Sequence, residues 1–195
     1  LCTMNNILNV GAVPIGIYDW DQFQDYKQPI VDYCLLNEKT NTVESSIAPE
    51  VKHNLWESEF NFLSKPHLHE LNNWITLTTR LFVNTVNNSN YHVAITDSWA
   101  HITENGGHHE PHRHLNSSWS GIFYIQQEDL DSGKNIFFNY NSMPDVKGYE
   151  FYNEQFTIDI KPGRLVIFPS TMLHYAKPYL GTDKRIVVAF NAVCI

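Results

Sequence analysis

The sequence has few cysteines, few charges and no long apolar run. Its three cysteines, Cys2, Cys34 and Cys194, are scattered along the chain and form no CxxC pair, which excludes a disulfide framework. No apolar run approaches the roughly 18 residues that a membrane span needs, and no secretory leader opens the chain. We therefore expect reduced thiols and a soluble cytoplasmic protein without a membrane partner.

Basic residues are also scarce, since 13 Lys and Arg stand against 21 Asp and Glu and the net charge is −8. An acidic chain is a poor ligand for nucleic-acid phosphates or anionic lipid, so we expect neither partner. Of the 195 residues, 43% are hydrophobic and 13% are aromatic, which is typical of a globular chain. The length favours a single domain over residues 1–195.

The first ninety residues carry helical and irregular patterns. Pro29 predicts the opening of a short helix that runs to Leu36, because proline is tolerated in a first helical turn. A longer amphipathic helix is predicted over Pro66–Val86, where apolar residues recur at spacings of three and four. The stretch Lys39–Phe62 between them lacks sustained periodicity and predicts a connecting segment.

From residue 91 the pattern changes to short runs of β-branched and aromatic residues bounded by Gly, Pro, Asn and Asp. The runs predict strands at Tyr91–Ile102, His109–His114, Trp119–Gln126, Asn135–Tyr140, Gln155–Ile160, Arg164–Phe168, Met172–Lys177 and Lys184–Val193. Short strands with few helices between them indicate a mainly β fold, with antiparallel sheets in a sandwich or jelly roll. We expect residues 91–195 to form this core and residues 1–90 to support it.

Four of the ten histidines lie in the segment Gly106–His114, which reads GGHHEPHRH. On a strand, residues two apart share a face, so Glu110, His112 and His114 are expected to project together. Such an edge predicts a metal site, and an exposed polar loop without a ligand is the alternative. His174, which opens a later predicted strand, is a candidate for a remote third ligand.

Arg185 is a candidate for binding an anion beside this metal. Turn residues around Leu180–Gly181 predict a hairpin that makes His174 and Arg185 diagonal neighbours, roughly 7–8 Å apart. A metal and a guanidinium that face one pocket suit a small dicarboxylate, which chelates the metal and pairs with the arginine. A surface ion pair is the alternative role for Arg185.

Short motifs occur in a specific order along the second half of the chain. They are Asp97-Ser98-Trp99, Gly107, His109, Pro111-His112-Arg113-His114, Ser120 to Ile125, Ser132-Gly133, Pro162 to Ser170, His174, and Arg185 through Asn191. In this order and spacing the sequence resembles the iron(II) and 2-oxoglutarate-dependent oxygenases. Within them it resembles a prolyl-hydroxylase-like family of marine bacteria and their phages, which implies a bacterial or phage-infected host cytoplasm.

The resemblance implies a double-stranded β-helix, a jelly roll whose open end holds iron, with N-terminal helices against one sheet. It implies that His112 and His174 bind Fe(II) and that Arg185 pairs with the far carboxylate of 2-oxoglutarate. Tyr124 falls where relatives often have a tyrosine that contacts this cosubstrate, and a core aromatic is its alternative role. Val187, two residues after Arg185, stands where relatives often place a Ser or Thr for the same carboxylate.

The implied activity is a dioxygenase that hydroxylates a small molecule or a peptidyl or amino-acid side chain, with release of succinate and CO2. The wider superfamily usually has His-x-Asp or His-x-Glu, the start of a two-histidine, one-carboxylate triad, where this chain has His112-Arg113-His114. Because the smaller family itself carries His-x-His, the expected ligands are His112, His114 and His174. Glu110 and His109 are the alternatives to His114.

Two other functions fit the same motifs. Gly106 followed by His112-x-His114 also resembles the first cupin motif, which implies a three-histidine metalloenzyme that does not use 2-oxoglutarate. The glutamate that should follow in that motif is missing. A non-catalytic β-sandwich that binds a ligand is the third hypothesis. Replacement of Arg185 separates the first two, because it abolishes turnover of 2-oxoglutarate and leaves a cupin reaction largely intact.

Overall fold

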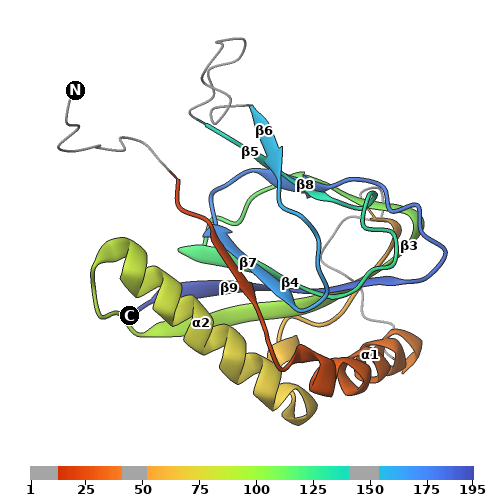
Figure 1. Cartoon of the computed structure of the whole chain (residues 1–195), viewed down its shortest axis with the longest axis horizontal. Coiled ribbons are helices and arrows are strands. Elements are labelled where there is room, and N and C mark those ends of the chain that lie inside the picture. Colours follow the sequence, from red (N-terminus) through yellow and green to blue (C-terminus); the bar gives the residue numbers. More distant parts are fainter. Residues whose placement is uncertain (1–12, 41–51, 141–153) are drawn as a thin grey trace, which may run out of the picture.

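Two helices pack against one face of a curled antiparallel sheet in the computed structural model, which describes residues 13–40, 52–140 and 154–195 (Figure 1). The helices are α1 (Phe23–Thr40) and α2 (His69–Asn87), and short 3-10 turns η2 (Phe62–Ser64) and η3 (Pro66–Leu68) lie between them. The strands are β1 (Gly16–Asp19), β2 (Lys52–Glu57), β3 (Val93–His112), β4 (Trp119–Gln126), β5 (Asn135–Phe138), β6 (Gln155–Thr157), β7 (Arg164–Pro169), β8 (His174–Ala176) and β9 (Arg185–Cys194). The predicted mainly β class with supporting helices is confirmed. No helix among the described residues is both long and apolar enough to cross a membrane.

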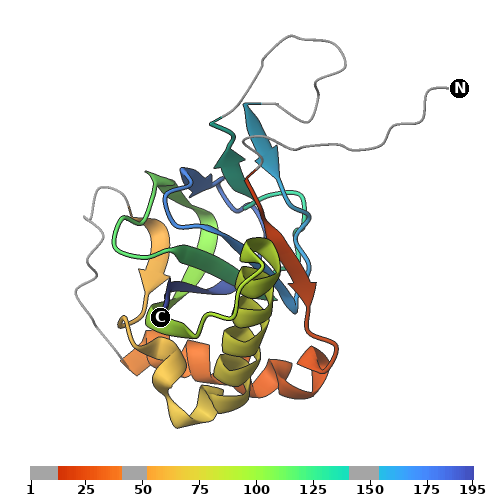
Figure 2. The same cartoon turned by 90° about the vertical axis from the view of Figure 1, so that its left-hand side faces the viewer.

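The strand order is β1-β7-β4-β9-β3-β8-β5-β6, and β2 pairs with β3 outside this path. Strand β3 joins the two halves of the sheet, because its first part pairs with β9 and its end pairs with β8. Figure 2 shows that the sheet curls at β3, so that the half with β8, β5 and β6 faces the half with β4 and β9. The curl forms a barrel-like interior that is separate from the face covered by the helices.

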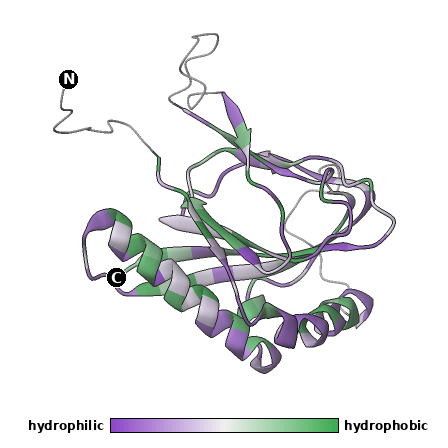
Figure 3. Cartoon of the chain, in the orientation of Figure 1, coloured by the Kyte–Doolittle hydropathy of each residue, from purple (hydrophilic) through white to green (hydrophobic). Residues whose placement is uncertain are grey.

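The core has two parts. The larger cluster fills the space between the helices and the sheet, where α2 contributes the buried side chains Leu71, Ile75, Phe82 and Val83. These positions follow the three-to-four spacing that predicted the helix, and apolar and polar segments alternate along α2 in Figure 3. The smaller cluster lies inside the barrel and includes Tyr124, Phe137 and Phe168.

The predicted break between the strands Tyr91–Ile102 and His109–His114 is wrong, because β3 runs without interruption to His112. The two glycines between them predict a turn, but here they allow β2 to approach closely. Gly106 has a φ of +80°, and a Cβ on Gly107 would lie 2.4 Å from the backbone oxygen of Asn54. The strand ends two residues before His114, which therefore does not share a strand face with Glu110.

Two further predictions in the first part of the chain need correction, and one strand was missed. Helix α1 begins at Phe23, so Pro29 lies inside it rather than at its opening. Burial of Phe23, Ile30, Val31 and Cys34 offsets the roughly 3 kcal/mol cost of an interior proline. The segment Lys39–Phe62 is not only a connection, since its residues 52–57 form β2 while 41–51 lie outside the described residues. Strand β1, an edge strand, was not predicted.

The predicted hairpin between the strands of His174 and Arg185 is also wrong. Strand β8 pairs with β3 and β5, whereas β9 pairs with β3 and β4, so β3 lies between them. The connection between β8 and β9 is held away from a tight turn by Tyr179, whose backbone N–H and oxygen bond to Gly107 and Gly106 of β3. These hydrogen bonds fix the connection to β3, where it passes from one half of the sheet to the other.

Candidate metal centre

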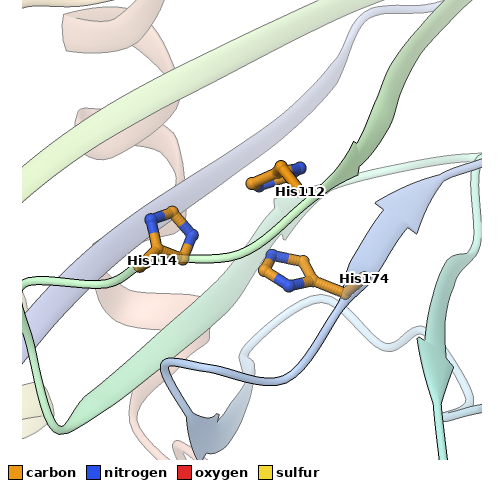
Figure 4. A group of neighbouring side chains, drawn as sticks. All are labelled: His112, His114 and His174. Atoms are coloured by element: carbon orange, nitrogen blue, oxygen red, sulfur yellow. The ribbon is translucent and has the colours of Figure 1, made fainter.

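Three histidines meet where the two halves of the sheet come together. His112 ends β3, His174 opens β8 directly opposite it, and His114 lies just beyond the end of β3. One ring nitrogen from each of the three lies within 4.8 Å of the others, and Figure 4 shows the three rings gathered around a common point. Among the residues that the structure describes, this is the group of histidine, cysteine and acidic side chains able to hold a metal ion.

Backbone carbonyls determine which ring nitrogen each histidine presents. Nδ1 of His112 lies 2.8 Å from the backbone oxygen of Glu110, and Nδ1 of His174 lies 2.9 Å from that of Met172. A carbonyl oxygen only accepts, so in both rings Nδ1 carries the proton and donates. Nε2 is then unprotonated and available as a metal ligand, and the carbonyls hold the rings in place.

Burial keeps all three imidazoles neutral. Desolvation and then the nearby His112 lower the pKa of His174 to about 3 and that of His114 to about 4. The pKa of His112 itself is lowered, mainly by burial. A neutral imidazole is the form that binds metal, and the absence of protons to displace favours binding at neutral pH.

The other two candidates from the sequence lie outside this group. Glu110 is half-exposed, and its carboxylate lies 3.3 Å from Nε2 of His108. The ring of His109 packs 4.1 Å from that of His112, centroid to centroid, but it contributes no atom to the group of ligand nitrogens. The structure thus brings a ring nitrogen of His114, rather than an atom of Glu110 or His109, into the group with His112 and His174, although its role as a ligand stays a prediction.

His114 reaches the group because the chain bends after β3. Its backbone N–H donates to the oxygen of Ser170 at 2.8 Å, and its ring packs 5.6 Å from that of Trp99. Both contacts come from residues distant in the sequence. These contacts position the imidazole of His114. Its position had been predicted from the alternation of side chains along a strand, which does not apply here.

The three histidines line a cavity of about 30 Å3 that Arg185 also lines. Its apolar walls come from Leu55, Trp99, Ile122, Phe168 and Ala189, and Asn135 and Ser120 add polar groups. No aspartate or glutamate is among the described residues that line it.

Arg185 is 3% exposed and is held by two amide oxygens. Its Nε donates to Oε1 of Gln127 and its Nη2 donates to Oδ1 of Asn135, both at 2.9 Å. In the described part of the chain, no carboxylate forms an ion pair with it, and burial lowers the pKa of its guanidinium. Arginine stays protonated in proteins, so this is a buried cation without an anionic partner.

Tyr124 lies beside Arg185 rather than on the cavity wall. Its hydroxyl donates to Oδ1 of Asn135 at 2.9 Å, and its ring centre is 5.9 Å from the guanidinium carbon. Complete burial raises the pKa of Tyr124 to about 12, so the hydroxyl keeps its proton. Tyr124 is thus a buried core aromatic beside Arg185, and its contact with the cosubstrate stays a prediction.

Sequence reasoning missed the groups that hold Arg185. Gln127 donates through Nε2 to the backbone oxygens of Asp129 and Ser132 at 2.7 Å each, so its Oε1 is turned to the arginine. Asn135 opens β5, and nothing in the local pattern around it distinguishes it from the many other asparagines. Also missed was a buried pair on the cavity side of β3, in which His101 lies 2.8 Å from Glu57.

The donor set fits a transition metal. Imidazole nitrogens suit iron, and three ligands from one side leave coordination positions open toward the cavity. The guanidinium-bearing Arg185 lines the same cavity as the three histidines. The arrangement can therefore hold a metal and a small anionic chelator together.

Comparison with protein families agrees with this geometry. Residues 97–191, which include the three histidines and Arg185, match the family model described as "Putative 2OG-Fe(II) oxygenase". The chain carries a 2OG-Fe(II) oxygenase domain. The predicted class of enzyme, a 2-oxoglutarate-dependent dioxygenase, and its cofactors Fe(II) and 2-oxoglutarate are thereby confirmed. No curated protein matches the sequence.

Solved structures of this class share the fold at low sequence identity. The α-ketoglutarate-dependent epimerase SnoN from nogalamycin biosynthesis is 9% identical, with a TM-score of 0.70 over 93% of this chain and 76% of its own. A prolyl-4-hydroxylase from Pseudomonas putida is 12% identical, with a TM-score of 0.63 over 92% of each chain. The viral collagen prolyl hydroxylase of Paramecium bursaria Chlorella virus-1 is 15% identical, with a TM-score of 0.57 over 91% of this chain and 94% of its own. These likenesses confirm the double-stranded β-helix of the oxygenase domain.

Proposed function

We propose that this oxygenase domain hydroxylates its substrate at an iron held by His112, His114 and His174, with 2-oxoglutarate anchored by Arg185. The observation that carries the proposal is the buried guanidinium, which shares one cavity with the histidine group and has no carboxylate partner among the described residues. An unpaired buried charge is costly, and it is retained where a ligand supplies the opposite charge.

The far carboxylate of 2-oxoglutarate fits this requirement. Two N–H groups of Arg185 are used by Gln127 and Asn135, which leaves three of its five donors for an anion. The two amide oxygens orient the guanidinium plane before any ligand binds, so little conformational entropy is lost on binding. Tyr124 has a positioning role in the proposal, because it shares the Asn135 oxygen with Arg185.

Iron, when bound, supplies the chemistry by which O2 and 2-oxoglutarate yield succinate, CO2 and one hydroxyl group on the substrate. The chain's own part is to hold the metal through three neutral imidazoles. The backbone oxygens of Glu110 and Met172 fix the orientation of two of the rings. Apolar walls around the histidines restrict water at the site.

The substrate proposed is a small molecule or a peptidyl or amino-acid side chain. Solved relatives include prolyl hydroxylases, one of them bound to a peptide fragment, and an epimerase bound to nogalamycin RO. Trp99 and Leu55 give the cavity an apolar wall, and none of the acidic side chains that the structure describes lines it. These features favour a neutral group at the reacting position over a cationic one.

Anaerobic titration of Fe(II) into the metal-free protein tests the proposal, with and without 2-oxoglutarate. We expect a weak visible charge-transfer band that requires both ligands and is lost in His174→Ala and in Arg185→Gln. His92→Ala and Arg80→Gln are the matched controls, because His92 is exposed directly before β3 and Arg80 lies on α2. Release of succinate from 2-oxoglutarate in air then gives the readout for a screen of substrates.

Two results contradict the proposal. Iron binding that 2-oxoglutarate does not change favours the three-histidine cupin hypothesis. A band that survives in Arg185→Gln means that the guanidinium does not anchor the cosubstrate.

A further inference from the structure

The hydroxyl of Thr103 is buried without a hydrogen-bond partner. Thr103 is 2% exposed, and its Oγ1 is one of two buried side-chain polar atoms in the described residues that have no partner, the other being an oxygen of Asp183. Threonine hydroxyls normally find an acceptor when buried, because an unsatisfied hydroxyl costs free energy relative to one in water. An unpartnered hydroxyl in a native core therefore points to a ligand or a water molecule.

Thr103 lies next to the arginine of the proposed cosubstrate site. It is the direct partner of Arg185 in the register of β3 and β9, so the two side chains stand on the same face of the sheet. Opposed residues of this kind have Cβ atoms about 4.5–5.5 Å apart. His101, two residues earlier on the same face of β3, lines the cavity with Arg185.

The methyl group of Thr103 lies against the backbone of Gly107. A Cβ on Gly107 would lie 2.5 Å from Cγ2 of Thr103, so the methyl group faces Gly107 closely. The contact with Gly107 is thus made by the methyl group and not by the hydroxyl. Only a glycine at position 107 leaves room for this arrangement.

The neighbouring position on the same face of β9 supplies no hydroxyl, because residue 187 is valine. Val187, two residues after Arg185 on β9, has a methyl group where the resemblance leads us to expect Ser or Thr. It lies opposite His101, one pair along from Thr103 on the same face. A carboxylate accepts about four hydrogen bonds, more than a bidentate arginine provides.

We propose that Thr103 donates a hydrogen bond to the carboxylate that Arg185 binds, and so replaces from the neighbouring strand the hydroxyl absent at Val187. Thr103 is thus a positioning residue for the distal carboxylate of 2-oxoglutarate. The inference rests on the proposed function, since it assumes that this anion occupies the cavity.

The test is the affinity for 2-oxoglutarate in the presence of Fe(II) without oxygen, measured by the visible band and by calorimetry. Thr103→Val keeps the shape of the side chain and removes the hydroxyl, whereas Thr103→Ser keeps the hydroxyl. We expect Thr103→Val to raise the Kd about tenfold and Thr103→Ser to leave it within about threefold. Thr103→Ala also removes the hydroxyl, and we expect it to raise the Kd by about the same factor as Thr103→Val.

A second ligand tests whether the change in affinity depends on the distal carboxylate. 2-Oxobutyrate has the chelating end of 2-oxoglutarate and no far carboxylate, so we expect it to bind the wild type and Thr103→Val equally. Adding Val187→Thr to Thr103→Val is expected to restore part of the affinity for 2-oxoglutarate. Thr79→Val is the matched control, because Thr79 is buried in α2 with its hydroxyl bonded to the oxygen of Ile75.

The outcomes separate this inference from the proposed function. Unchanged affinity for 2-oxoglutarate in both Thr103→Val and Thr103→Ala overturns the inference and leaves the proposed function standing. An equal loss of affinity for 2-oxobutyrate also overturns it, since the effect is then not at the distal carboxylate. Failure of the wild type to bind 2-oxoglutarate overturns the proposed function, and this inference with it.

Discussion

The substitution Asn135→Asp places a carboxylate beside the buried guanidinium and tests the central argument about Arg185. Oδ1 of Asn135 lies 2.9 Å from Nη2 of Arg185, so the new charge centres would be about 4 Å apart. At an effective dielectric constant of about 20 their attraction is about 4 kcal/mol. The free-energy cost of burying the new carboxylate offsets part of this attraction. We expect the folded state to be stabilised by about 1–2 kcal/mol in total. Tyr124 keeps an acceptor, because the carboxylate still offers an oxygen to its hydroxyl.

The same change is expected to weaken the binding of 2-oxoglutarate. The internal carboxylate neutralises Arg185 and repels the carboxylate of the ligand, so the Kd should rise at least about 100-fold, or about 2.7 kcal/mol. Stability and affinity thus move in opposite directions. A general disturbance of the fold would lower both.

Urea unfolding of the metal-free protein at pH 7 and calorimetric titration with Fe(II) and 2-oxoglutarate measure the two effects. Asn73→Asp, on an exposed position of α2, controls for the change in net charge. Asn135→Asp protein that binds 2-oxoglutarate as tightly as the wild type refutes the assignment of Arg185 as the anion site. Lower stability with intact cooperativity refutes the view that the guanidinium lacks a counter-charge.

Three further predictions concern the fold and its titration. Gly163→Ala should cost at least about 1–2 kcal/mol in urea unfolding, because φ is +89° there and the added Cβ would lie 2.8 Å from the ring of Phe23; a neutral result contradicts this. The metal-free protein should melt at lower temperature at pH 5 than at pH 7, because the pKa of His174 is about 3 when folded and near 6.5 when unfolded, so the unfolded chain takes up protons first. His174→Gln should flatten this dependence, and an unchanged slope is inconsistent with the pKa. Burial raises the pKa of Cys34 to about 12, so in a Cys2→Ser variant an aromatic disulfide reagent at pH 8 should label Cys194 first and Cys34 only after unfolding.

Features that depend on neighbours in sequence could be predicted from the sequence. The apolar spacing of α2 and the bounds of β4 follow from local periodicity, and β4 lies at Trp119–Gln126 as predicted. The histidine-rich segment and the later His174 stand out by residue type alone. Their order, together with Arg185, carried the resemblance to the oxygenases, and the family match confirms that class of enzyme.

The pairing of strands could not be predicted from the sequence. Polar residues and two glycines predicted a break in β3, since nothing local shows that β2 lies close enough to require Gly107. The hairpin from His174 to Arg185 was predicted from turn residues, yet both strands pair with β3 instead. A pairing between distant strands depends on the whole sheet and leaves little trace in either segment.

The sequence alone therefore determined the class of enzyme, the mainly β architecture and the residue types of the candidate site. Only the tertiary structure decided that His114 and not Glu110 meets His112 and His174. It also placed Gln127, Asn135 and Thr103 around Arg185. The physical reason is that a residue's chemistry is local, whereas the burial that removes its solvent and the partners that replace it come from segments far along the chain.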